Sequence, residues 1–357
     1  MAHIKLDGIA KSFAGHAALS DISLEIEDGQ FFVLLGPTGA GKTTMLRLIA
    51  GLEKADSGAI SIDHVDVGAW SAAQRDVALV LQQYSLYPRY TVRENLEFPL
   101  KSKMRGLEKA EIDDRVARAA KIVRIEHLLA RKTDQLSGGE MQRVSIGRAI
   151  VRDPRVFLMD EPLSNLDAKL REALRAELKD LKMRLGATFL FVTHDQIEAM
   201  SMGDKIAVLK DGRIIQVGTP HEIYNKPRDV FVAGFVGSPA MNLLLARAER
   251  GRAVITPGLF EIDLPGPIGQ RLSETGRPFK LGVRAEDIRI GAEQEMEARV
   301  HHVENQGVEK IVTLRIGECL FRAAAPATMA LAIDDRLRFS MNAERLHIFD
   351  AETGISC

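Results

Sequence analysis

The chain has 357 residues, of which 46% are hydrophobic and 27% are charged, and its formal net charge is −1. This composition indicates a globular protein of two domains or three small ones, and the charge balance argues against a nucleic-acid partner. Two cysteines, Cys319 and Cys357, are too few for a disulfide framework and fit a reducing compartment. The N-terminus lacks a secretory signal pattern and no run of about 20 apolar residues occurs, so we expect no membrane span.

Strand-like and helix-like segments alternate over the first two thirds of the chain. Three short, continuously apolar runs at residues 31–35, 156–159 and 188–192 are typical of buried strands. An amphipathic helical stretch separates the last two runs. This alternation predicts an α/β fold, with a largely parallel sheet and helices on its faces. Residues 206–215 are expected to form a hairpin with an Asp-Gly turn.

The pattern changes after about residue 235. Beyond that point Gly and Pro recur, and short alternating strand patterns replace the helices. Such a pattern predicts a small all-β barrel or sandwich. We therefore expect two domains, residues 4–235 and residues 236–357.

A glycine-rich segment follows the first apolar run and precedes a helical pattern. It reads Gly36-Pro37-Thr38-Gly39-Ala40-Gly41-Lys42-Thr43-Thr44. The strand–loop–helix context predicts a nucleoside-triphosphate site, because the glycines let backbone N–H groups face phosphate oxygens. We expect Lys42 to reach the β- and γ-phosphates and the Thr43 hydroxyl to bind Mg²⁺. A plain glycine turn before a helix is the alternative, and the Lys-Thr pair argues against it.

Two carboxylates end the second apolar run. Buried carboxylates are costly without a cation or hydrogen bonds, and Mg²⁺ would compensate Asp160. Glu161 is placed to polarise a water for attack on the γ-phosphate. His194 follows the third run, and neighbouring parallel strands end at one crevice, so it is a candidate γ-phosphate sensor. Each residue alone would also fit an ordinary strand end.

A second glycine pair stands at a predicted helix start. Ser137 fits an N-cap and Glu140 completes a capping box with it. Gly138 and Gly139 between them would also expose backbone N–H groups to an anion.

These segments together resemble the ABC transporter ATPases over residues 4 to about 235. Residues 136–140 are similar to the family signature, although Glu140 stands where Gln is usual. Residues 158–167 are similar to the Walker B motif and D-loop, and residues 80–88 to the Q-loop. The resemblance implies a P-loop cassette with a helical subdomain. It also implies a dimer, of identical chains or with a sister ATPase, because ATP lies between the phosphate loop of one subunit and the signature of another.

The resemblance also assigns roles to single residues. It implies that Gln82 contacts Mg²⁺ and the attacking water, and that the segment around Tyr87 and Arg89 meets a membrane subunit. Asp167 would connect the two sites of the dimer. Phe13 would stack on adenine, although a single Phe is more often a core residue. The expected ATP contacts are therefore Phe13, residues 36–44, Gln82, Ser137, Gly138, Gly139, Glu140 and Asp167, with Thr43, Gln82 and Asp160 as Mg²⁺ ligands and Glu161 and His194 as catalytic residues.

The last third of the chain resembles a more specific group within this family. Residues 282–288 look like the GxRPE segment of an appended OB-type (TOBE) domain, with Ala285 where Pro is usual. Together with residues 218–224, this segment resembles the maltose-type importer ATPases. That family implies a peripheral subunit at the cytoplasmic face of the inner membrane. Its partners would be two transmembrane permease subunits and, indirectly, an extracytoplasmic solute-binding protein.

The transported solute stays open at this stage. A sugar, polyol or glycerol phosphate is the first expectation, and a polyamine or iron importer is the alternative, since those families share much of this layout. A soluble ABC ATPase of DNA repair or translation would usually carry a coiled-coil insertion or a second cassette, and the sequence has neither. A mainly regulatory role of the C-terminal barrel, through a bound regulator or small molecule, is a third possibility.

Overall fold

The computed structural model describes residues 2–102, 106–255, 260–264, 266–291 and 296–357. The chain forms two compact units, Met1–Pro220 and His221–Cys357. The boundary predicted at residue 236 falls after two short helices, α7 (Pro220–Asn225) and α8 (Val230–Phe235). The segment from His221 to Phe235, which holds most of α7 and all of α8, therefore belongs to the second compact unit. Whether residues 4–235 and 236–357 are separate functional domains stays a prediction.

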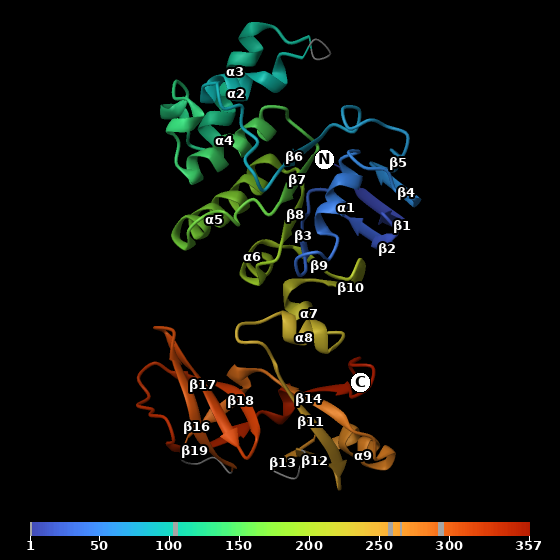
Figure 1. Cartoon of the computed structure of the whole chain (residues 1–357), viewed down its shortest axis with the longest axis vertical. Helices are drawn as coiled ribbons and strands as arrows, with labels where there is room; N and C mark the ends of the chain where they lie inside the picture. Colours follow the sequence, from blue (N-terminus) through green and yellow to red (C-terminus); the bar gives the residue numbers. More distant parts are fainter. Residues whose placement is uncertain (1, 103–105, 256–259, 265, 292–295) are drawn as a thin grey trace. The chain divides into compact units, whose positions relative to one another are not determined.

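A six-stranded sheet forms the centre of the first unit (Figure 1). Every neighbouring pair in it is parallel except β9 and β10. Every residue of β3, β7 and β8 is buried, because these strands are covered on both faces. The three apolar runs and the hairpin are thus confirmed as predicted. The strands in spatial order are β10 (Arg213–Gly218), β9 (Lys205–Lys210), β3 (Phe31–Leu35), β8 (Thr188–Thr193), β7 (Val156–Asp160) and β6 (Val77–Val80).

A smaller antiparallel sheet packs against the central sheet through a common core. The core includes Leu6 and Ile22 of the small sheet, Met45 of helix α1 (Lys42–Ile49) and Leu190 of β8. This packing holds α1 in place, and with it the loop that joins the carboxyl end of β3 to α1. The small sheet consists of β2 (His16–Ile26), β1 (Ile4–Phe13), β4 (Ser57–Ile62) and β5 (Val65–Asp66).

Three helices gather beyond the β6 edge of the central sheet and form a helical subdomain (Figure 1). They are α2 (Val92–Glu97), α3 (Lys109–Ile122) and α4 (Gly138–Ile150), with short 3₁₀ turns at Phe98–Leu100, Glu126–Leu128 and Thr133–Gln135. Two further helices, α5 (Ala168–Leu185) and α6 (Gln196–Met202), follow β7 and β8. In the described part of the chain, no helix has both the length and the apolar character needed to cross a membrane.

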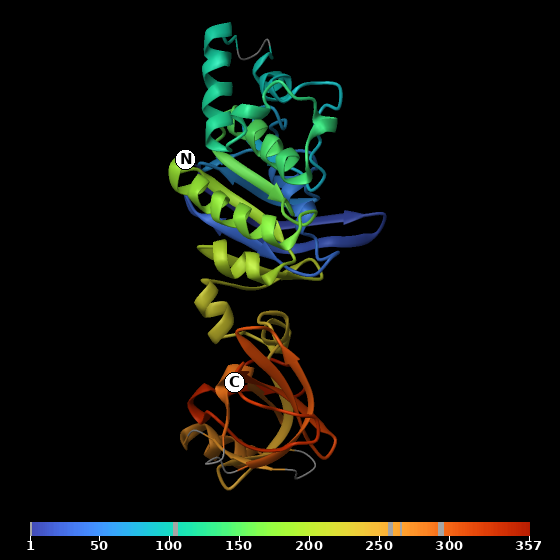
Figure 2. The same ribbon diagram turned by 90° about the vertical axis from the view of Figure 1, so that its left-hand side faces the viewer.

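The second unit is mainly β, and its strands curve around one apolar core (Figure 2). Two five-stranded sheets contribute to this core, and all of their strand pairs are antiparallel. This architecture confirms the predicted OB-type all-β fold. The first sheet contains β13 (Glu261–Asp263), β12 (Arg252–Ile255), β11 (Asn242–Glu249), β14 (Phe279–Val283) and β20 (His347–Asp350), and the second contains β15 (Ile288–Ile290), β19 (Arg336–Met341), β16 (Met296–Asn305), β17 (Glu309–Ile316) and β18 (Cys319–Pro326), with helix α9 (Gly266–Thr275) between β13 and β14.

A buried arginine ties helix α7 and the end of α8 to this barrel. Arg284 is only 2% exposed, and its Nη atoms donate to Val236 O and Tyr224 O. Its guanidinium carbon lies 3.8 Å from the centroid of the Tyr224 ring. Burial and the hydrogen bond to Glu286 raise the pKa of Tyr224 to about 12. Arg284 therefore has a packing role in the part of the sequence that resembles the GxRPE segment.

We predict that Arg284→Ala destabilises the second unit by about 2–4 kcal/mol, because the buried Val236 carbonyl and the partly buried Tyr224 carbonyl would lose their charged donor. Chemical denaturation followed by far-UV circular dichroism measures this loss. Arg345→Ala is the matched control, since Arg345 is exposed on the same unit, and it should change the free energy of unfolding by less than about 0.5 kcal/mol. Equal effects of the two substitutions would contradict the packing role.

Candidate nucleotide-binding site

The phosphate loop connects β3 to α1 in a conformation that requires glycine. A Cβ atom on Gly36 would lie 2.3 Å from the carbonyl oxygen of Leu209. Gly41 has a φ of 105°, and a Cβ there would lie 2.6 Å from Ala18 O. The loop is therefore held tightly between β9 and β2, with the N-terminal end of α1 immediately after it. Such an N-terminus is suited to phosphate oxygens.

Lys42 is buried at the first position of α1 and points back over the loop. Its side chain is 5% exposed, and Nζ donates to Gly36 O at 2.9 Å and to Pro37 O at 3.0 Å. The same Nζ lies 3.5 Å from Glu161 Oε1. Two carbonyl groups and one carboxylate thus hold the ammonium group beside the loop whose backbone N–H groups are expected to bind phosphates.

Thr43 and Asp160 meet where α1 passes the end of β7. Thr43 Oγ1 donates to Asp160 Oδ1 at 3.1 Å, and Asp160 is 7% exposed. The pKa of Asp160 is raised, mainly by burial and also by the neighbouring Glu161 charge, although the Thr43 hydrogen bond acts in the opposite direction. A cation would stabilise the charged carboxylate, and a hydroxyl beside a carboxylate offers the oxygen ligands that Mg²⁺ prefers. These two residues therefore fit the predicted metal role.

Glu161 lies between two other candidate groups. Its Oε2 lies 2.9 Å from Nδ1 of His194, and its Oε1 faces Lys42. The backbone of Glu161 has a φ of 44°, which is uncommon for a residue other than glycine. Strained backbone of this kind is often found at functional sites. The ends of β3, β7 and β8 thus bring Lys42, Glu161 and His194 into one network.

Gln82 lies next to this network but contacts different residues. The side-chain Nε2 of Gln82 donates to Ser164 Oγ at 3.2 Å, and the backbone carbonyl oxygen of Gln82 accepts from Asn165 Nδ2 at 3.0 Å. Ser164 Oγ in turn donates to Glu161 O at 2.9 Å. Ser164 therefore links the Gln82 side chain to the backbone of Glu161, a connection that the sequence analysis did not predict.

The signature segment forms the predicted capping box at the start of α4. Ser137 Oγ accepts from Glu140 N, and the Glu140 carboxylate accepts from both Ser137 N and Ser137 Oγ. The hydrogen bonds from Ser137 lower the pKa of Glu140. Gly139 packs so closely on α5 that a Cβ would lie 2.3 Å from the Leu170 side chain. The hydrogen bonds between Ser137 and Glu140 show that glutamate is well suited to capping α4.

Three of the predicted contacts have their hydrogen-bond or ring partners outside the phosphate loop. Among the described residues, no hydrogen bond or ion pair joins the signature segment to residues 36–44. Asp167 caps α5 by accepting from Leu170 N at 2.9 Å. Phe13 lies near the tip of the β1–β2 hairpin, is 43% exposed, and has Lys11 Nζ at 5.1 Å from its ring centroid. Their roles toward a nucleotide stay predictions.

The phosphate loop, its lysine and the carboxylates at the end of β7 define the class of P-loop nucleotide hydrolases. Family models extend this assignment along the chain. A model described as "ABC transporter" matches residues 19–164, "MalK OB fold domain" matches residues 237–288, and "TOBE domain" matches residues 281–349.

Three relatives match this chain over almost its full length. The sn-glycerol-3-phosphate import ATP-binding protein of Brucella abortus is 46% identical, over 99% of this chain and 98% of its own. The trehalose/maltose import ATP-binding protein of Thermococcus litoralis is 45% identical, and the sulfoquinovosyl glycerol transport ATP-binding protein of Agrobacterium fabrum is 43% identical, each over 99% of both chains. The chain belongs to the ABC transporter ATPases with a C-terminal MalK-type OB fold and TOBE domain.

A solved structure resembles the first unit. It is the dimeric ATP-binding cassette MJ0796 in a post-hydrolysis state bound to ADP and Pi, with a TM-score of 0.56 and 34% identity. The match covers 61% of this chain and 98% of that one. It confirms the predicted cassette fold.

Proposed function

We propose that this chain is the ATP-hydrolysing subunit of an ABC importer for a carbohydrate or glycerol-phosphate solute. The main observation behind this proposal is a cluster of interacting side chains at the ends of three parallel strands. Its members are Lys42, Thr43, Asp160, Glu161 and His194. The names of the full-length relatives, which are import or transport ATP-binding proteins, supply the transport context.

In this proposal the chain binds ATP through the loop amides and Lys42, with Phe13 against the adenine. The Thr43 hydroxyl and the Asp160 carboxylate would hold Mg²⁺, and the Gln82 amide oxygen is suited to join them. When bound, Mg²⁺ would neutralise charge that develops on the phosphate oxygens. Glu161 orients the attacking water, and His194 keeps the Glu161 carboxylate in place through their 2.9 Å contact.

The ATP site is composite in this proposal, with the signature segment supplied by a second subunit. Ser137, Gly138 and Gly139 begin α4, where an N-terminal helix end favours anions. In the described part of the chain, no hydrogen bond or ion pair connects this helix end to its own phosphate loop. The second subunit is another copy of this chain or a sister ATPase, and Asp167 would lie at the contact between the two sites.

The membrane partners of the proposal would dock near the Q-loop. Tyr87, Tyr90 and Phe98 form an aromatic cluster with ring centroids 4.4–6.1 Å apart. Tyr90 is 38% exposed and Phe98 is 44% exposed. An exposed aromatic cluster at the end of the Q-loop is suited to a helix of a permease subunit. The chain would thus act at the cytoplasmic face of the membrane, with a solute-binding protein on the other side.

Uptake measurements test the solute class. Cells that lack this chain should lose uptake of one radiolabelled solute from a panel of glycerol 3-phosphate, trehalose, maltose and sulfoquinovosyl glycerol. The wild-type chain should restore that uptake, whereas Lys42→Ala should not. Unchanged uptake of the whole panel, together with co-purification of the chain with ribosomes or DNA, would contradict the proposal.

A further inference from the structure

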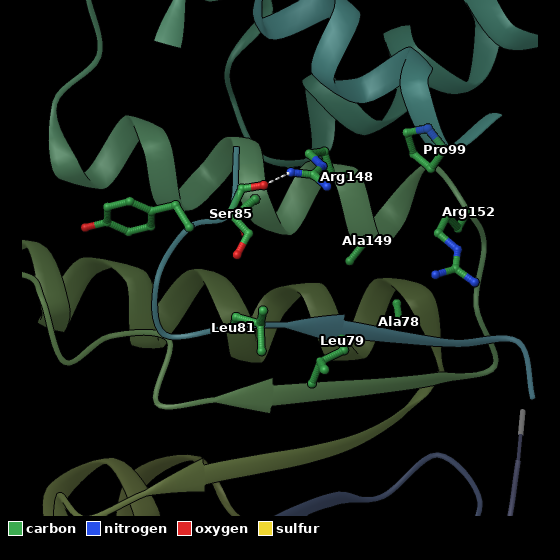
Figure 3. A pocket seen from close by; sticks show the side chains of 10 residues that line it. Ala78, Leu79, Leu81, Ser85, Pro99, Arg148, Ala149 and Arg152 are labelled. Carbon is green, nitrogen blue, oxygen red and sulfur yellow. Dashed lines mark hydrogen bonds between the residues drawn. The ribbon is translucent and has the colours of Figure 1, made fainter. Parts of the chain in front are cut away.

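A cavity of about 130 Å³ lies between strand β6, the Q-loop and helix α4 (Figure 3). Ala78 and Leu79 of β6 form part of its apolar wall, and α4 and its C-terminal end contribute two arginines, Arg148 and Arg152. Figure 3 shows Arg148 directed at Ser85, whereas Arg152 lies at the other end of the cavity. Neither arginine belongs to the nucleotide network described above.

Arg148 connects α4 directly to the Q-loop. Its Nη1 donates to Ser85 O at 2.5 Å, and its guanidinium carbon lies 4.9 Å from the Tyr87 ring centroid. Burial lowers the pKa of Arg148, yet an arginine stays charged at neutral pH. A carbonyl oxygen and an aromatic face therefore hold a partly buried cation between α4 and the loop.

Two other residues hold the same loop from its flanks. Gln82 is tied to residues 164 and 165 beside Glu161. Asn95 of α2 is fully buried, accepts from Tyr87 N at 2.9 Å and donates to Thr91 O at 3.0 Å. Between these anchors, Ser85 has a left-handed φ of 50°. Arg148 therefore joins the middle of the loop to α4 through a side-chain hydrogen bond.

We propose that Arg148 is a positioning residue that makes residues 85–87 move with α4, so that closure of the signature helix over ATP reaches the aromatic surface at Tyr87. Arg148 acts through Ser85 and Tyr87 and contacts no nucleotide. The inference rests on the proposed function, because it assumes that α4 carries the signature and that the aromatic surface meets a permease.

The test uses the full chain assembled with the permease subunits that co-purify with it, reconstituted in lipid vesicles. Arg148→Ala should keep the ATP affinity of the isolated chain and its basal turnover within about twofold. Solute transported per ATP hydrolysed should fall by about tenfold, in line with the usual size of a coupling contact. Arg148→Lys, which keeps the charge over Tyr87 without the planar donor fork, should recover part of this ratio. Arg152→Ala removes a charge from the same cavity and should leave the ratio unchanged.

Hydrogen exchange gives a second readout that needs no permease. In the wild-type chain, ATP should change the exchange of amides in residues 83–90 together with those of α4. In Arg148→Ala only the α4 amides should respond. A variant that keeps the wild-type transport ratio, or loses it no more than Arg152→Ala does, overturns the inference alone. A wild-type assembly with no solute-dependent turnover overturns the proposed function and the inference with it.

Discussion

Glu161→Gln is expected to keep ATP binding while steady-state turnover falls by a factor of about 10²–10⁴, the usual contribution of a general base. The amide is nearly isosteric with the carboxylate and can keep a contact with His194, but it cannot orient and polarise water as the carboxylate does. The loss of a charge beside Lys42 should also favour retention of the triphosphate, since their 3.5 Å ion pair would no longer compete for the ammonium group. Phosphate release measures turnover, and filter binding measures retained ATP.

Glu140→Gln is the matched control for this experiment. It makes the same chemical change at the start of α4, where glutamine can also complete a capping box with Ser137. Turnover should stay within about threefold of wild type, because glutamine can keep the cap, and Glu140, although expected among the ATP contacts, is not expected to orient the attacking water. Wild-type turnover in Glu161→Gln would remove Glu161 from the catalytic role.

Lys42→Ala is expected to weaken ATP binding by a factor of about 10–100, which corresponds to the loss of a charged hydrogen bond of about 1.5–3 kcal/mol. Turnover should fall as well, because developing charge on the phosphates would lose its nearest protein cation. Isothermal titration calorimetry measures the affinity in the presence of Mg²⁺.

The control for this substitution is Lys101→Ala. Lys101 is exposed and pairs with Glu97 in the helical subdomain, away from the phosphate loop. Its removal should leave the dissociation constant unchanged within error, since surface ion pairs contribute little. An affinity equal to wild type in Lys42→Ala would show that the loop amides alone bind the triphosphate.

Local sequence patterns predicted the centre of the fold because short-range physics determines them. Continuous apolar runs identified β3, β7 and β8, and a serine followed three residues later by glutamate identified the start of α4. The motif order then predicted which side chains would meet at the strand ends. Lys42, Asp160 and Glu161 lie together as that reasoning required.

Contacts between distant segments could not be predicted in the same way. The bond from Arg148 to Ser85 joins residues 63 positions apart, and it depends on how α4 packs beside β6. Arg148 did carry one signal, because a charged residue interrupts an otherwise small and apolar helix run, Ile146-Gly147 before it and Ala149-Ile150 after it. Exposure of Phe13 likewise depends on the hairpin that carries it.

The Glu140 departure from the usual signature has a structural account. Its carboxylate accepts two hydrogen bonds from Ser137, and a negative charge in the first turn of α4 is stabilised by the helix dipole. Glutamine could make the same bonds without the charge. The glutamate is therefore compatible with an intact helix start, although its charge would lie close to any anion bound there.

The composite ATP site is the central claim, and a structure of the Glu161→Gln chain with Mg²⁺ and ATP tests it most directly. We predict a dimer in which ATP lies on the phosphate loop of one subunit, with backbone N–H groups of Ser137 to Gly139 of the other subunit within hydrogen-bonding distance of the γ-phosphate. A nucleotide-bound chain in which these residues face solvent or their own subunit would contradict the account.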